Sequence, residues 1–152
     1  KRAAQWKHWQ VEVLPKLLLP FVRILHETKS LHDYAPLKIL AKSCGCIGRI
    51  FKVAIVRFSA IEDVVLTMCA CTPAPVQLIN TSAFACAPIS FSLAVDLHVL
   101  EFMRNLFVHI TPNNTALVLA LERVLANMGF QLDHKNSLRH RFSNCFMWYS
   151  HL

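Results

Sequence analysis

Four cysteines, arranged in two close pairs, are the residues of this sequence whose types and spacing could do chemistry. The first pair is Cys44-Gly45-Cys46 and the second is Cys69-Ala70-Cys71. Structural zinc sites are tetrahedral, and their Cys or His ligands arrive mostly as close pairs from separate chain segments. One residue between ligands is a tight spacing that requires a sharp turn, for which Gly45 and Ala70 leave room. The pattern therefore predicts a four-cysteine zinc site.

Two other interpretations of the four thiols stay open at the level of sequence. Free cysteine is a common core residue, so the thiols could be packed side chains without a metal. Four cysteines also hold iron–sulfur clusters. The amphipathic start of the sequence does not fit a secretory signal, so we expect a reducing compartment and no disulfide framework. The other two cysteines, Cys86 and Cys145, are expected to be packing residues.

A β-hairpin is predicted between the two cysteine pairs, and it would carry both pairs to its base. Residues 50–58 alternate like a strand, and residues 64–68 are rich in β-branched side chains. Residues 59–63 are predicted to form the turn. Because this turn is off the midpoint between the pairs, near Arg57 and Phe58, we also expect a bulge or an uneven loop.

Helical periodicity dominates the rest of the chain. The predicted helices are 2–31, 73–80, 92–109, 115–128 and 137–150, with a connector at 32–42 and a loop at 82–91. Pro15 and Pro20 interrupt the first helix, so it is either kinked or divided in two. We therefore predict an α+β, mostly helical fold with a zinc-clipped β-hairpin embedded among about five helices.

Three ranges divide this predicted fold. Residues 1–31 form an N-terminal helical segment, 32–81 form the cysteine-cluster zinc module with its hairpin, and 82–152 form a C-terminal helical segment that packs on it. We expect the three ranges to make one compact unit. Because the sequence begins with Lys1, we also expect it to belong to a longer protein.

Composition narrows the class of protein. Of the 152 residues, 55% are hydrophobic and only 16% are charged, which excludes a disordered segment. The net charge of +7 favours an acidic partner such as nucleic acid. The long uncharged stretch 64–95 is interrupted by three prolines, so no membrane-spanning helix is predicted there.

Three basic side chains, Lys7, Arg139 and Arg141, are candidate contacts to nucleic acid. The alternative, which we favour for the last helix, is a charged outer face over an aromatic core stripe. Neither a glycine-rich phosphate loop nor a nucleophile elbow occurs in the sequence. We therefore expect no enzymatic activity from this chain.

Several runs of the sequence carry a resemblance to a known family. They are QWKHW (5–9), VLP (13–15), CACTPAPVQLI (69–79), AFACAP (83–88), LAVDLHVLEFMRNLF (93–107), PNNTA (112–116), SLRHRFSNC (137–145) and WY (148–149). Together they resemble the N-terminal region of fungal KDZ (Kyakuja–Dileera–Zisupton) transposase-like proteins. In those proteins a CxC-type cysteine cluster precedes the transposase domain, and the resemblance covers nearly the whole chain.

The resemblance implies a non-catalytic, zinc-chelating module that accompanies a transposase. Its cluster positions would be Cys44, Cys46, Cys69 and Cys71, and a downstream domain would carry the catalysis. It also implies a nuclear location and association with DNA or chromatin. Two alternatives remain: a structural or protein-interaction domain, for example for oligomerisation, whose fold zinc only stabilises, and a decayed transposon relic.

Departures from the family pattern fall on loops. The run 82–85 reads SAFA where relatives tend to have Gly before the aromatic residue and Pro after it. Phe91 stands where Pro is expected, and Ser143 where Gly is expected. These changes put the loop geometry in doubt and would suit a decaying copy of a mobile element, but none touches a proposed ligand.

Overall fold

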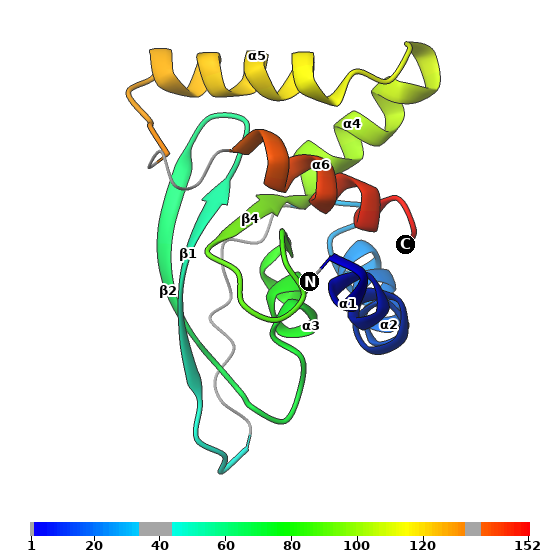
Figure 1. Cartoon of the computed structure of the whole chain (residues 1–152), viewed down its shortest axis with the longest axis vertical. Helices are drawn as coiled ribbons and strands as arrows, with labels where there is room; N and C mark the ends of the chain where they lie inside the picture. Colours follow the sequence, from blue (N-terminus) through cyan, green and yellow to red (C-terminus); the bar gives the residue numbers. More distant parts are fainter. Residues whose placement is uncertain (1, 34–43, 133–137) are drawn as a thin grey trace.

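The computed structural model describes residues 2–33, 44–132 and 138–152, and it has the predicted α+β fold (Figure 1). Its four strands are β1 Arg49–Val56, β2 Ile61–Met68, β3 Ala83–Ala85 and β4 Leu93–Asp96. They form one mixed sheet in the order β2-β1-β4-β3. β1 pairs antiparallel with β2 and parallel with β4, and β3 pairs antiparallel with β4.

The predicted hairpin is present, but its turn differs from the prediction. β1 and β2 pair in one unbroken register, from Arg49 opposite Met68 to Val56 opposite Ile61. Residues 57–60 form the turn, closed by a hydrogen bond from the Arg57 N–H to the Ala60 carbonyl (2.9 Å). The predicted turn at 59–63 is therefore wrong, and of the two alternatives the bulge is absent while the uneven connection is present: two residues separate Cys46 from β1 and none separates β2 from Cys69. Packing of Ile61 against the core places this segment in the strand, and its acidic neighbours lie at the strand surface.

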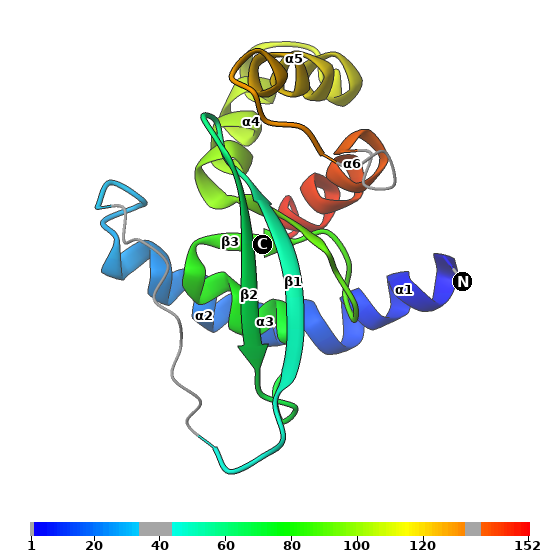
Figure 2. The ribbon, with the colours of Figure 1, turned by 90° about the vertical axis from the view of Figure 1, so that its left-hand side faces the viewer.

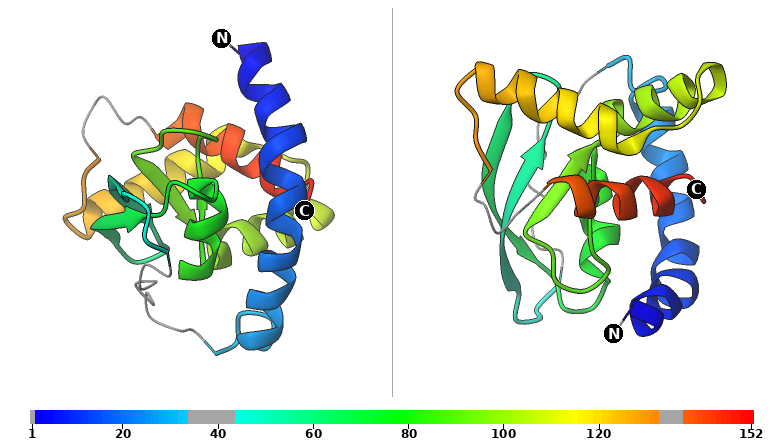
Figure 3. Two further views of the ribbon diagram at one scale, coloured as in Figure 1. Left: turned by 90° about the horizontal axis from the view of Figure 1, so that it is seen from below. Right: turned by 45° about the horizontal axis from the view of Figure 1, so that its top comes forward.

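The N-terminal segment is one continuous helix rather than two. It comprises α1 Arg2–His8, the π-helical turn η1 Trp9–Val13 and α2 Leu14–Glu27 (Figure 3). The Leu14 N–H donates to the Trp9 carbonyl, which closes a wider turn directly before Pro15. Proline lacks an N–H and crowds the preceding turn, so a wider turn accommodates it within the helix. The helix ends four residues before the predicted boundary, where residues 29–31 take positive φ angles.

The remaining helices all lie after the β1–β2 hairpin in the chain. They are α3 Ala74–Leu78, the 3-10 turn η2 Ile79–Thr81, α4 Leu97–His109, α5 Asn114–Asn127 and α6 Leu138–Tyr149. With the continuous N-terminal helix counted once, the described residues contain the predicted five α-helices. The helix predicted over 115–128 ends as expected, and Gly129 directly after it has a left-handed φ of 90° that favours glycine.

Two short strands occupy places where the sequence predicted other structure. β3 lies in the predicted loop 82–91, and β4 replaces the first turn of the helix predicted over 92–109. Every residue of both strands is buried. Such strands lack the alternation that marks half-exposed strands, and periodicity cannot separate them from helix. Asp96 fixes the boundary, because its side chain accepts a hydrogen bond from the His98 N–H (2.8 Å) and caps α4.

Alternate residues of β1 enter two hydrophobic clusters. The larger cluster contains Val56 with Trp9, Leu100 and Phe142, so segments from all three predicted ranges share it. The smaller cluster contains Val53, Ile55 and neighbours from β2, α3 and β3. The aromatic stripe of α6 lies in the larger cluster, which confirms the prediction that it is core.

The uncharged stretch 64–95 is divided among β2, α3, η2, β3 and part of β4. Within the described residues, no helix has the length and apolar character needed to cross a membrane. The connector predicted over 32–42 lies almost entirely outside the described residues.

Candidate metal centre

The two cysteine pairs converge at the base of the β1–β2 hairpin. The Sγ atoms of Cys44 and Cys46 are 2.8 Å apart, those of Cys44 and Cys69 are 2.8 Å apart, and those of Cys46 and Cys69 are 3.1 Å apart. With Cys71, all four sulfur atoms lie within 4.8 Å of one another. Zinc–sulfur bonds of about 2.3 Å in a tetrahedron separate the ligand sulfurs by about 3.8 Å. The four thiols therefore fit a single metal ion after small side-chain movements.

The register of the hairpin explains why the pairs meet. Cys44 and Cys46 precede β1, and Cys69 and Cys71 follow β2. Because the first residue of β1 lies opposite the last residue of β2, the chain enters and leaves the hairpin side by side (Figure 2). Pairs placed just outside the two strands must then face each other.

Gly45 does not have the role that the sequence predicted for it. It is absent from the residues with positive φ, and a Cβ atom added there would meet no other atom within 4 Å. An L-residue would therefore fit at this position. The sharp turn between Cys44 and Cys46 does not depend on glycine.

Hydrogen bonding within the cluster distributes the thiol protons unequally. The thiols of Cys44 and Cys69 and the Ala70 N–H lower the pKa of Cys46 to about 6. Hydrogen bonds with Cys69, Cys46 and Cys44 raise the pKa of Cys71 to about 12. The Cys71 N–H also donates to the Cys69 Sγ (3.2 Å). The cluster thus presents a thiolate that N–H groups and neighbouring thiols stabilise, and thiolate is the form that binds metals.

Gln77 on α3 holds the second pair in place. Its Oε1 accepts from the Cys69 N–H (2.8 Å), and its Nε2 donates to the Cys69 carbonyl (2.8 Å) and the Thr72 carbonyl (2.7 Å). One side-chain amide thus fixes both ends of the turn 69–72 and joins it to α3. Gln77 was not among the predicted site residues. The one sequence feature that could have indicated its role is that it is the single polar residue of the short helix APVQL.

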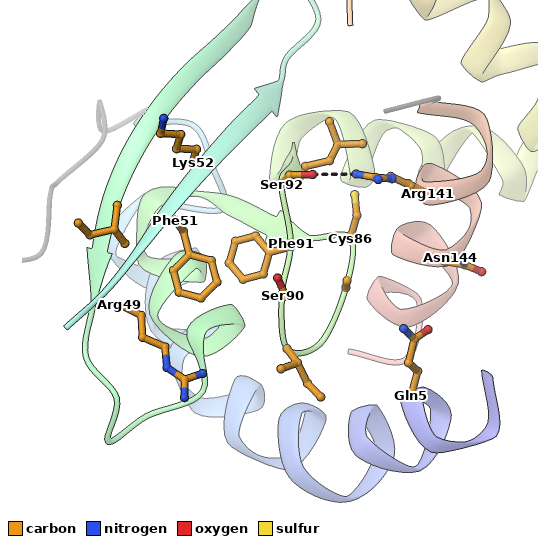
Figure 4. Close-up of a pocket in the computed structure, with 14 residues that line it drawn as sticks. Gln5, Arg49, Phe51, Lys52, Cys86, Ser90, Phe91, Ser92, Arg141 and Asn144 are labelled. Carbon is orange, nitrogen blue, oxygen red and sulfur yellow. Dashed lines mark hydrogen bonds between the residues drawn. The ribbon is translucent and has the colours of Figure 1, made fainter. Parts of the chain in front are cut away.

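The three candidate nucleic acid contacts lie on two helices, α1 and α6. Lys7 is exposed on α1 and Arg139 is exposed on α6. Arg141, also on α6, donates to the Ser92 Oγ (2.9 Å) and lines a cavity with Arg49 (Figure 4).

Cys86 and Cys145 are buried, which confirms that they are packing residues. The Cys145 thiol points to the Phe84 carbonyl (3.8 Å), and burial raises its pKa.

Comparisons with protein families, with curated proteins and with solved structures found no match for this chain. The resemblance to the KDZ-associated region therefore stays a prediction.

Proposed function

We propose that this chain is a non-catalytic zinc module of a KDZ transposase-like protein, acting in the nucleus in association with DNA or chromatin. The observation that carries the zinc assignment is the set of four sulfur atoms within 4.8 Å of one another. Thiolate ligands select zinc, copper(I) or iron over the hard cations magnesium and calcium. A cluster of several iron and sulfide ions would spread its cysteine ligands more widely than one ion does, so the geometry favours a single ion, and zinc is the ion that sets of four cysteines hold in structural sites.

Four protein ligands also support a structural role. Catalytic zinc keeps one position open for water or substrate, whereas structural zinc is closed by four side chains. Zinc held by Cys44, Cys46, Cys69 and Cys71 would join the two ends of the hairpin, and Gln77 would connect this junction to α3. Catalysis would then belong to a domain downstream of this chain.

A second candidate, a protein-interaction domain with zinc only stabilising the fold, is favoured by exposed apolar side chains. They are Val108 in the last turn of α4, Ile110 directly after it, and Leu119, Val124 and Met128 on or after α5. A contiguous exposed apolar patch is typical of protein contacts, and this second candidate expects these side chains to belong to one. Analytical ultracentrifugation of the purified chain separates the candidates, because a stable oligomer supports this one.

Metal analysis tests the zinc proposal directly. We expect about one zinc per chain, as a single four-cysteine site requires. The paired substitution Cys44→Ser with Cys69→Ser should abolish zinc binding, whereas Cys86→Ala, the matched control, should leave it intact. Zinc retained by the paired variant would refute the ligand assignment. For DNA, binding should weaken steeply with salt, and absence of binding at 50 mM salt would remove DNA from the proposal.

A further inference from the structure

Two adjoining cavities lie between the cysteine cluster and α6. The larger one, of about 770 Å³, is bounded by β1, segment 86–93 and α6 (Figure 4). The smaller one, of about 370 Å³, reaches the turn 69–72 of the cysteine cluster. Arg49 and Phe51 line both cavities. The two cavities thus adjoin along β1, and we call them together the β1 groove.

The described residues that line the β1 groove include cations from three elements and no carboxylate. Arg49 and Lys52 come from β1, Arg141 comes from α6, and Lys16 comes from α2. Lys16 forms an exposed ion pair with Glu12 (3.3 Å), a kind of pair that holds its partner weakly. A concave surface lined by one sign of charge concentrates counter-ions, so the groove favours a polyanion.

An aromatic pair lies between these cations. The rings of Phe51 and Phe91 stack with centroids 5.1 Å apart and an interplanar angle of 21°. Phe91 is buried and Phe51 is half-buried, so Phe51 is the ring that a ligand in the groove can reach. Arg49 and Lys52 flank it along β1, as Figure 4 shows.

The edge of β1 adds main-chain groups to the same side. The Ala54 N–H donates to the Ser92 carbonyl (2.9 Å), and β4 pairs with β1 only from Ala54 onward. Main-chain amides of a strand point alternately to its two edges, so the amides of Ile50 and Lys52 are directed like that of Ala54. They therefore face the groove beyond the end of β4.

We propose that the β1 groove binds single-stranded nucleic acid. Arg49, Lys52 and Arg141 contact successive phosphates, and a base stacks on Phe51. This proposal rests on the proposed association with DNA and names the site and the form of the ligand. A cationic groove with an aromatic platform is the combination that binds single strands without sequence preference. An aromatic ring inside a concave groove reaches a base only when that base is unstacked, which disfavours duplex.

Fluorescence anisotropy on the zinc-loaded chain tests the proposal, with a labelled thymidine 12-mer, the same oligonucleotide as a duplex, and a uridine 12-mer. We expect the single strand to bind more tightly than the duplex. Three phosphate contacts should weaken binding about 20-fold between 50 and 200 mM salt. Arg49→Ala should lower the salt slope by about 0.7. Arg123→Ala is the charge-matched control, because Arg123 is exposed on α5 and lines neither cavity.

The aromatic contact has its own pair of variants. Phe51→Leu should weaken binding about 5- to 100-fold, the range measured when a stacked base loses its aromatic partner. Phe51→Tyr keeps a ring and should bind within about twofold of the unmodified chain. Circular dichroism and zinc content show whether both variants remain folded, and the comparison is made between variants that do.

The outcomes separate this proposal from the one on which it rests. Duplex binding that Arg49→Ala and Phe51→Leu leave unchanged would overturn the groove and keep the association with DNA. No binding of any oligonucleotide at 50 mM salt would overturn both. Equal displacement by a polyglutamate 12-mer would overturn the nucleic acid assignment in favour of an acidic peptide. Tighter binding of the uridine 12-mer would support the groove and assign it to RNA.

Discussion

Substitution of Gln77 by alanine provides a stringent test of the metal centre. Gln77 is not a metal ligand, and it contacts the cluster only through main-chain atoms of residues 69–72. A change in metal affinity on Gln77→Ala would therefore report how strongly the helix α3 preorganises the second cysteine pair. A ligand substitution cannot give this information, because it removes a bond to the metal as well.

The magnitude follows from the three hydrogen bonds. Each contributes about 1 kcal/mol net, and together they contribute about 2–3 kcal/mol when all are made in the zinc-bound state. If the metal-free turn 69–72 is disordered in the variant, this energy appears as lost metal affinity. Residues that orient metal ligands in this way typically change affinity 10- to 100-fold, which agrees with about 2 kcal/mol. We therefore expect Gln77→Ala to weaken zinc binding about 30-fold.

Zinc affinity is measured by competition with a chromophoric chelator at constant pH, because ligand protonation changes the apparent affinity. Gln10→Ala is the matched control, since Gln10 is exposed on the N-terminal helix and the same atoms are removed. Gln77→Glu keeps the acceptor for the Cys69 N–H but places a carboxylate oxygen against the Cys69 and Thr72 carbonyls, so its zinc affinity should be no higher than that of Gln77→Ala. Affinity of Gln77→Ala within twofold of the control would refute the reasoning.

Three further predictions concern the rest of the molecule. Asp96→Asn should lower the free energy of unfolding by about 3 kcal/mol, because it breaks the buried ion pair with Arg57. Asp33→Asn, at an exposed ion pair, is the control and should leave the thermal stability unchanged. Ser82→Gly should raise the stability by about 1 kcal/mol, measured by urea denaturation, because Ser82 has a φ of 57° that favours glycine. Chelation of the metal should leave the helical circular dichroism signal largely intact, because the larger core cluster is built without the four cysteines; global unfolding by chelation would contradict this.

The candidate metal site was predictable because two independent sequence patterns indicate it. Paired cysteines carry a ligand signal, and the β-branched alternation between them predicts the hairpin that joins the pairs. Gln77 was not predictable, because one polar side chain in a short helix has no pattern of its own. Arg49 and Phe51 were likewise missed, since their importance arises only where β1 extends beyond β4, a feature of tertiary pairing.

The fold was predictable where one face of an element is exposed. The helices with apolar stripes were found, and their ends agreed to within a few residues in most cases. β3 and β4 were missed because both are buried on every side and therefore carry no polar alternation. The π-helical turn before Pro15 could not be predicted either. Sequence rules treat proline as a residue that breaks or kinks a helix, and they do not predict that a widened turn can keep the helix continuous.

The hairpin is attached to the rest of the molecule at both ends, and only one attachment needs a metal. At the turn, Arg57 pairs with the buried Asp96, which also accepts from His98 Nδ1 (2.9 Å), and the other ring nitrogen of His98 bonds the Leu31 carbonyl (2.7 Å). At the base, the thiol cluster joins the two ends of the hairpin, and Gln77 connects the second cysteine pair to α3. Since β4 supports β1 only from Ala54 onward, loss of the metal should loosen the outer half of β1 first. That half carries the proposed groove, so the affinity for nucleic acid should depend on zinc even though zinc makes no contact with the ligand.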